Sequence, residues 1–176
     1  MPVEFEVYSV FITLLEARGW TVICASPPAG TDNRYRKCIL PRHIIGKENL
    51  KKGLRDEVDI TALSNQGDTV LLIEAKATLS DSLRILNSLG ESDLNKLSRL
   101  ILEFPPKEFI KLIYQGYGIK IVGSPQIIGM LAVGSVDCEL PKRFPVIEVG
   151  KSGFRLFSGG VLNKCILQLV ENLDKK

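Results

Sequence analysis

Three charged residues interrupt two short runs that otherwise have the composition of buried strands. Asp59 lies in EVDITAL, and Glu74 and Lys76 lie in TVLLIEAKA. Carboxylate oxygens suit Mg²⁺, and the main-chain carbonyl of Ala75 could supply a third oxygen ligand. A neighbouring lysine ammonium can orient or help to deprotonate a water molecule, and it can stabilise charge that develops on a phosphate. The pattern therefore indicates metal-assisted hydrolysis of phosphodiester bonds, with Mg²⁺ as the metal and Mn²⁺ as its substitute.

A hairpin is expected to bring the three charged residues together. The two runs are joined by NQGD, in which the glycine can adopt a positive φ. If Gln66 and Gly67 form a two-residue loop, Asp59 faces Glu74 across the strands, with Cβ atoms about 5 Å apart. Lys76 then lies on the same face, because side chains alternate along a strand. Like charges that face each other destabilise a sheet, so this register favours a bound cation between the carboxylates.

A strongly basic segment precedes the hairpin. Between residues 32 and 55 the chain has eight cationic and two acidic residues, a net charge of +6, whereas the whole chain carries +3. Such asymmetry is typical of contact with a polyanion, and a solvated basic loop is the alternative. A connection as long as residues 27–55 is unusual in a compact domain and is commonly functional. The candidate nucleic-acid-binding residues are Arg34, Arg36, Lys37, Arg42, Lys47, Lys51, Lys52 and Arg55.

The elements that position these residues are those of a single α/β domain over residues 1–176. Hydrophobic residues make up 45% and charged residues 24% of the chain, which is ordinary globular composition. Apolar periodicity predicts helices over 2–18, 80–90, 91–104 and 105–118, and strands over 20–26, 119–123 and 126–135. A C-terminal extension over about 136–176 adds the strands PVIEVG and FRLF and a helix in VLNKCILQLVENL. Residues 27–55 form the insertion, with one helical turn expected around KENLKKGL.

Several classes of protein are not expected. No apolar run approaches the roughly 20 residues of a membrane span, and the N-terminus lacks a secretory pattern, so a cytoplasmic protein is predicted. Cys24, Cys38, Cys138 and Cys165 form no C-x-x-C pair, and His43 is the single histidine. A zinc site and a histidine-based triad are therefore not expected. The cysteines are interpreted as small buried apolar residues.

The motif resembles that of the PD-(D/E)xK nuclease superfamily. Asp59 is followed by Glu74-Ala75-Lys76 on the next strand, within the order helix, strand, hairpin, helix, over roughly the first 135 residues. The resemblance to restriction enzymes and archaeal-type Holliday junction resolvases implies a restriction-endonuclease-like fold, a central mixed β-sheet flanked by helices with an αβββαβ core. It also implies that Asp59 and Glu74 bind the metal and that Lys76 is catalytic. Val58 stands where the motif has a proline, which is often missing in this superfamily.

The resemblance further implies a glutamate on the N-terminal helix. By helical phase, Glu4 lies on the apolar stripe with Val7 and Phe11 and could face the site. Glu6 falls toward the side that carries Thr13. Glu4 is therefore preferred, with Glu6 as the alternative.

The expected function is that of a metal-dependent endonuclease acting on DNA, of the restriction, resolvase, defence or repair type. Duplex cutting by such a small domain would favour a homodimer. A non-catalytic nucleic-acid-binding or assembly subunit with the same fold is one alternative. A structural α/β protein, in which the face that carries Asp59, Glu74 and Lys76 forms salt bridges with another element, is another. Tyr35, between Arg34 and Arg36, could stack on a base, and Trp20 is expected to pack in the core.

Overall fold

The protein has an α/β fold built on a mixed, open β-sheet. The computed structural model describes residues 4–26, Tyr35, Cys38, 58–77, 79–80, 106–137, 144–150, 153–157 and 164–171. Within these ranges the main sheet has six strands and is accompanied by three helices. The helices expected over 80–90 and 91–104, and the turn expected around KENLKKGL, lie outside the described residues.

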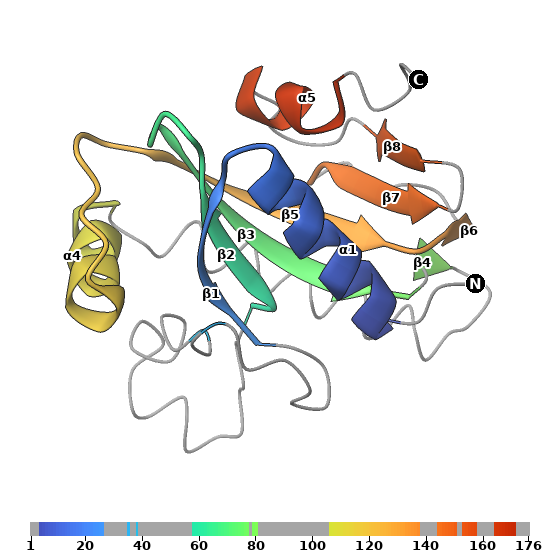
Figure 1. The fold of residues 1–176 in the computed structure, drawn as a ribbon, viewed down its shortest axis with the longest axis horizontal. Helices are drawn as coiled ribbons and strands as arrows, with labels where there is room; N and C mark the ends of the chain where they lie inside the picture. The colour runs from blue at the N-terminus through green and yellow to red at the C-terminus, as the bar shows by residue number, and fades with distance from the viewer. Residues whose placement is uncertain are drawn as a thin grey trace.

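The main sheet changes from antiparallel to parallel pairing at its centre. Its strands are β1 (Thr21–Ala25), β2 (Ile60–Leu63), β3 (Thr69–Lys76), β5 (Gln126–Val133), β7 (Val146–Gly150) and β8 (Gly153–Phe157), in the spatial order β1-β2-β3-β5-β7-β8 (Figure 1). β1, β2 and β3 pair antiparallel, β3, β5 and β7 pair parallel, and β8 returns antiparallel to β7. β3 therefore has a hydrogen-bonded strand on each side, as the strand that carries Glu74 and Lys76 was expected to have.

Each face of the sheet is covered by a different helix. α1 (Glu4–Ala17) crosses the face that bears Ile73 and Ala75, and its buried side chains are Val7, Tyr8, Phe11, Ile12, Leu14 and Leu15 (Figure 1). α4 (Pro106–Tyr117) packs through Phe109 and Ile113 against the opposite face, which bears Val70 and Leu72. The two faces follow from strand alternation, because successive side chains of β3 point to opposite sides.

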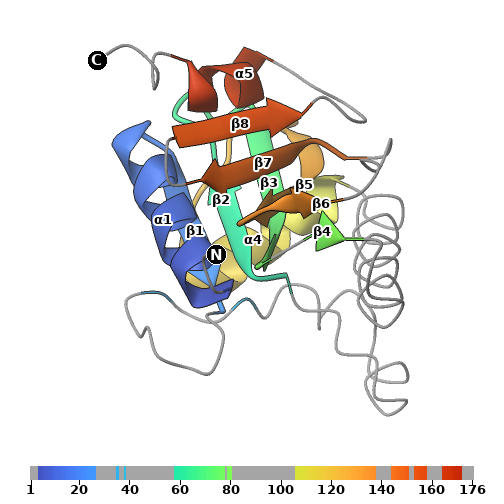
Figure 2. The same cartoon turned by 90° about the vertical axis from the view of Figure 1, so that its right-hand side faces the viewer.

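A third helix and a small second sheet complete the described structure. α5 (Lys164–Val170) lies beside β8 at the end of the sheet (Figure 2). Beyond β3 and β5 the chain forms β4 (Leu79–Ser80) and β6 (Val136–Asp137), which pair parallel to each other. The amide of Gly134 donates to the carbonyls of both Lys76 and Ala77, at 3.1 and 3.0 Å, where the main sheet ends.

Most of the predicted elements are present in the described part of the chain. Helix α1 ends as expected at Gly19, which has φ 78°, and α4 ends at Gly118, which has φ 70°. The strand predicted over 119–123 is wrong, because these residues form a loop between α4 and β5. Val122 is 81% exposed and Gly123 has φ 88°. The apolar residues of this loop have no neighbouring strand with which to pair, since β5 already pairs with β3 and β7.

The hairpin has the predicted register but a wider turn. Ile60 pairs with Ile73 and Leu63 with Val70, the pairing that the NQGD turn predicts. The Ser64 amide donates to the Thr69 carbonyl at 2.9 Å, and the chain reverses between these residues. The prediction of a two-residue loop at Gln66 and Gly67 is therefore wrong. The observed four-residue loop is symmetrical about the same two residues, so the register is unchanged.

Candidate active site

Asp59 lies directly before β2 and is fixed by three backbone contacts. Its amide donates to the Ile73 carbonyl at 3.1 Å, and its carbonyl accepts from the Ser26 amide at 2.7 Å. Its side-chain Oδ2 accepts a hydrogen bond from the Ala75 amide at 2.8 Å. The Asp59 carboxylate is thus held against the backbone of the E-A-K segment of β3.

Glu74 is a buried carboxylate in the middle of an apolar strand. Its side chain is 2% exposed, and its Oε1 atom is inaccessible to solvent. Both sequence neighbours, Ile73 and Ala75, are fully buried and point to the opposite face, toward α1. Burial of an ionised carboxylate is costly unless other charges or hydrogen-bond donors compensate for it, so the surroundings of Glu74 decide its charge state.

The backbone of Ala75 is oriented toward Asp59. In a strand the N–H and C=O groups of one residue point to the same side, so the carbonyl of Ala75 faces the same neighbour as the amide that Asp59 accepts. Lys76 follows on the same face as Glu74 and is half-buried. Asp59, Glu74, Ala75 and Lys76 therefore all lie at the end of β2 and β3 that is opposite the hairpin turn.

These groups fit a Mg²⁺ ion that retains several water ligands. Among the described residues, no three side chains of His, Cys, Asp or Glu are grouped as a metal cage. Mg²⁺ commonly binds through one or two carboxylates, with water and substrate phosphate completing its octahedron. Asp59 and Glu74, together with the Ala75 carbonyl, meet that requirement.

Glu4 and Glu6 lie near the end of the sheet that carries Asp59. They belong to α1, however, which covers the face opposite to that of Glu74. α1 ends at Gly19, close to Asn65 in the hairpin turn, so its first turn lies toward the end that carries Asp59. Glu6 is exposed, on the side of α1 that also exposes Thr13. Glu4 begins the helix, and its side chain lies outside the described residues. A helix glutamate would therefore approach the site around the end of the sheet.

Two residues of the basic segment are anchored in the core. Tyr35 packs against the cluster beneath α1, and Cys38 is buried in the cluster beneath α4. The Cys38 amide donates to Ser26 Oγ at 3.0 Å, and Ser26 in turn binds the backbone of Asp59. The side chains of Arg34, Arg36, Lys37, Arg42, Lys47, Lys51, Lys52 and Arg55 lie outside the described residues. The packing of Tyr35 against the core disfavours the hypothesis that it stacks on a base.

A third carboxylate on the same face of the sheet was missed by sequence reasoning. Glu148 on β7 pairs with Val133, which pairs with Lys76 on β3. Its Oε2 accepts from the Val136 amide at 3.1 Å, and its Oε1 lies 3.8 Å from the exposed Arg155 guanidinium. Two strand spacings, about 10 Å, separate it from Lys76. Glu148 therefore holds the start of β6 in place.

The opposite end of the hairpin carries a second polar group. Oδ1 of Asp68 accepts from Ser64 Oγ at 2.7 Å, from Thr69 Oγ1 at 3.3 Å and from Cys165 Sγ at 3.2 Å. The Ser64 hydroxyl, followed by the Cys165 thiol, holds the pKa of Asp68 below its usual value. These hydrogen bonds dock α5 against the turn.

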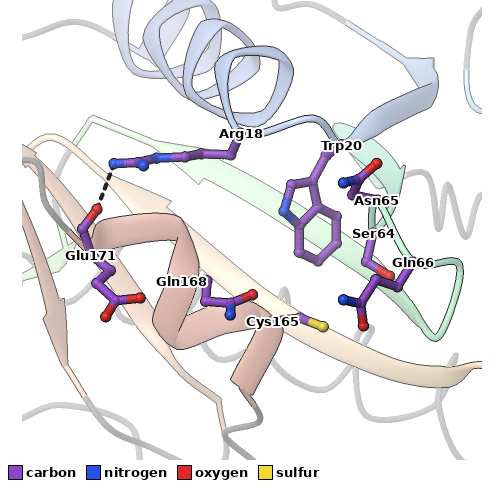
Figure 3. A pocket seen from close by; sticks show the side chains of 8 residues that line it. All are labelled: Arg18, Trp20, Ser64, Asn65, Gln66, Cys165, Gln168 and Glu171. Carbon is purple, nitrogen blue, oxygen red and sulfur yellow. Dashed lines mark hydrogen bonds between the residues drawn. The ribbon is translucent and has the colours of Figure 1, made fainter.

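A polar hollow of about 280 Å³ lies between α5, the turn and the end of α1 (Figure 3). It is lined by Arg18, Trp20, Ser64, Asn65, Gln66, Cys165, Gln168 and Glu171. The Arg18 guanidinium donates to the Glu171 carbonyl at 2.6 Å. Trp20 is buried at the hollow, as expected for a core residue. The hollow lies at the opposite end of the hairpin from Asp59.

Comparison with known proteins finds no relative: the chain matches no family model, no curated protein and no solved structure. Within the described part of the chain, none of the helices has the length and apolar character needed to cross a membrane. The function must therefore be argued from the residues and geometry of the site.

Proposed function

We propose that this protein is a metal-dependent endonuclease that hydrolyses phosphodiester bonds in DNA. The observation that carries the proposal is the contact between Asp59 Oδ2 and the Ala75 amide, at 2.8 Å. This contact joins the two halves of the motif, which are distant in sequence, beside the buried carboxylate of Glu74. A buried carboxylate and a half-buried one at a sheet end, next to a lysine, favour metal-assisted hydrolysis over structural stabilisation.

Each residue has a distinct role in this proposal. Asp59, Glu74 and the Ala75 carbonyl would hold Mg²⁺, which polarises the phosphate and lowers the pKa of bound water. Lys76 would orient the attacking water and stabilise negative charge on the phosphate as the bond breaks. Lys76 is half-buried at the last position of β3.

The order of elements supports a restriction-endonuclease-like fold. α1 precedes the antiparallel strands β1, β2 and β3, and α4 precedes β5, which pairs parallel with β3. The same αβββαβ order is the one that the resemblance to PD-(D/E)xK nucleases implies. On this proposal β7, β8 and α5 form the C-terminal extension.

The anchors of the basic segment support contact with a nucleic-acid backbone. Arg34 and Arg36 flank Tyr35 in sequence, and Lys37 precedes Cys38, whose amide is linked through Ser26 to Asp59. These three cations are adjacent in sequence to the two anchors. We propose that this part of the segment binds phosphates on either side of the cleaved bond.

A cleavage assay tests the proposal. Supercoiled plasmid, single-stranded DNA, a four-way junction and RNA are incubated with the protein and Mg²⁺ or Mn²⁺. We expect metal-dependent cutting of DNA, and a loss of about 10²–10⁴-fold in Lys76→Ala, because the group that assists proton transfer is removed. Asp59→Asn should be similarly impaired because it weakens the metal site.

The matched control is Lys164→Ala, which removes an exposed lysine of α5. It should cut at the wild-type rate. Equal cutting by wild type and Lys76→Ala would contradict the proposed site. Binding of the panel without cutting, independent of metal, would instead support a non-catalytic nucleic-acid-binding or assembly subunit.

A further inference from the structure

Two cysteines from different segments are buried in the same hydrophobic cluster. Cys24 lies in β1 and Cys38 lies in the basic segment, and both side chains are fully buried in the cluster beneath α4. Thr61 is the cross-strand partner of Cys24, and its Oγ1 lies 3.7 Å from Cys38 Sγ. Cys24 lies opposite Thr61 across β1 and β2, so both thiols lie beside the Thr61 side chain. The sulfur atoms therefore share one small buried space.

The two thiols differ in acidity. Burial by itself would raise the pKa of Cys24, but hydrogen bonds from Cys38, Thr61 and Tyr117 outweigh it and leave this pKa below its usual value. Burial, followed by the hydrogen bond with Cys24, raises the pKa of Cys38 well above its usual range. A thiolate is the nucleophile in thiol oxidation, and the partner thiol can then resolve the oxidised product when its proton passes to the departing hydroxide. The pair thus has one attacking and one resolving member.

We propose that Cys24 and Cys38 form a redox-sensitive dithiol that a hydroperoxide converts into an intramolecular disulfide. Cys24 sulfur attacks one oxygen of hydrogen peroxide, the O–O bond breaks, and water leaves after proton transfer, so that Cys24 becomes a sulfenic acid. Cys38 sulfur then attacks Cys24 sulfur, the S–O bond breaks, and a second water leaves. The two thiols are oxidised by two electrons and the peroxide is reduced to two molecules of water.

The disulfide would fix the basic segment to the sheet beside the candidate site. Cys38 already binds Ser26 through its amide, and Ser26 binds the carbonyl of Asp59. A covalent bond between Cys24 and Cys38 closes the chain segment that contains Arg34, Arg36 and Lys37. The reaction requires only the two thiols and the peroxide, so this inference is independent of the proposed nuclease activity.

Burial makes the reaction slow but selective. Peroxide must reach Cys24 through a local opening of the fold, whereas Cys165 is already partly exposed. Burial raises the pKa of Cys165, which lowers its thiolate fraction. Its nearest acceptor is Asp68 rather than a second thiol. Cys165 therefore serves as the internal comparison for the buried pair.

Peptide mapping of the full chain tests the proposal. The reduced, folded protein is treated with hydrogen peroxide, its remaining thiols are alkylated in denaturant, and it is digested with trypsin without reduction. Trypsin cleaves after Arg18, Arg34, Lys37 and Arg42, so Cys24 and Cys38 fall in peptides 19–34 and 38–42. We expect a linked species that has the summed mass of these peptides less two hydrogen atoms and that disappears on reduction.

Two variants sharpen the result. Cys165→Ser should form the same linked species at the wild-type rate. Cys38→Ser should not form it and should instead accumulate a sulfenic acid on Cys24, which dimedone traps. The wild-type map is decisive even if Cys38→Ser fails to fold. Recovery of both peptides fully alkylated, or linkage of either one to Cys138 or Cys165, would overturn the proposal.

Discussion

The two ends of the β2–β3 hairpin carry carboxylates that differ in solvent exposure. At the turn, Asp68 is exposed, and its Oδ1 accepts hydrogen bonds from Ser64, Thr69 and Cys165. At the open end, Glu74 is 2% exposed on an apolar strand. The turn carboxylate thus stabilises the local fold with donors from nearby residues. Burial of the second carboxylate carries a desolvation cost that exposure spares the first, and perturbed buried carboxylates are common at functional positions.

On the proposed function, the exposed carboxylate at the turn is structural and the buried carboxylate at the open end is a metal ligand. Removing charge at the open end should relieve a cost of folding, whereas removing it at the turn should weaken the fold. Changes to stability at the two ends should therefore have opposite signs. Only the open end should respond to a divalent cation.

The largest effect on stability is expected from Mg²⁺ at the open end. Because the ion would bind the folded state alone, it should raise the free energy of unfolding by about 2.7 kcal/mol at a concentration 100 times its Kd. Asp59→Asn combined with Glu74→Gln should abolish this response. Without metal, the same double variant should melt about 2–4 °C above wild type, as relief of about 1 kcal/mol of repulsion and desolvation would give. Thermal unfolding with and without Mg²⁺ measures both effects.

Asp68→Asn is the matched control for that experiment. It removes a carboxylate charge at the turn and should preserve the wild-type response to Mg²⁺. Equal stabilisation of wild type and the double variant by Mg²⁺ would place the cation elsewhere. A lower melting temperature in the double variant would show that Asp59 and Glu74 belong to a structural ion network.

A smaller effect is expected from Ser64→Ala at the turn. The Ser64 hydroxyl accepts from the amides of Asp68 and Thr69, at 3.1 and 3.0 Å, and donates to the Asp68 carboxylate. Ser64 is buried, so its loss leaves the Thr69 amide without this acceptor and should cost about 1–2 kcal/mol. Urea denaturation measures the loss. DNA cleavage should remain at the wild-type rate, and a loss of cleavage in the folded variant would contradict the separation of the two ends.

The smallest effect is expected from the charge of Asp68 alone. Hydrogen bonds from Ser64 and Cys165 lower the pKa of Asp68 in the folded state, so its contribution to stability is present above the unfolded pKa. That contribution disappears as pH falls through the lowered folded pKa. Wild type should therefore exceed Asp68→Asn in unfolding free energy above about pH 5, and the two should converge in stronger acid. A difference that does not change with pH would show that the carboxylate charge is not its source.

The hairpin register could be predicted because the chain's own turn sets it. A two-residue loop and the observed four-residue loop are both symmetrical about Gln66 and Gly67, so an error in loop length left the pairing of Ile60 with Ile73 unchanged. A shift of one residue would have turned every side chain of the strand to the other face. The nearness of Asp59 to the E-A-K segment follows from this local pairing.

Contacts between distant segments could not be predicted in the same way. Cys165 meets Asp68 only because α5 packs beside the turn, and Cys38 and Cys24 are distant in sequence but are buried in the same cluster. No periodic pattern and no turn in the sequence predicts either contact. The strand predicted over 119–123 failed for a related reason, since apolar alternation does not show whether a partner strand is available.

β3 pairs antiparallel with β2 and parallel with β5. We therefore expect the hairpin to form before Glu74 is buried. Ile60 and Ile73 pair through a short connection, and short loops close quickly. Glu74 reaches its final surroundings only when Leu131 of β5, much later in the chain, pairs beside it. During synthesis on the ribosome the hairpin can therefore form while Glu74 is still hydrated, and desolvation of this carboxylate belongs to a late step of folding.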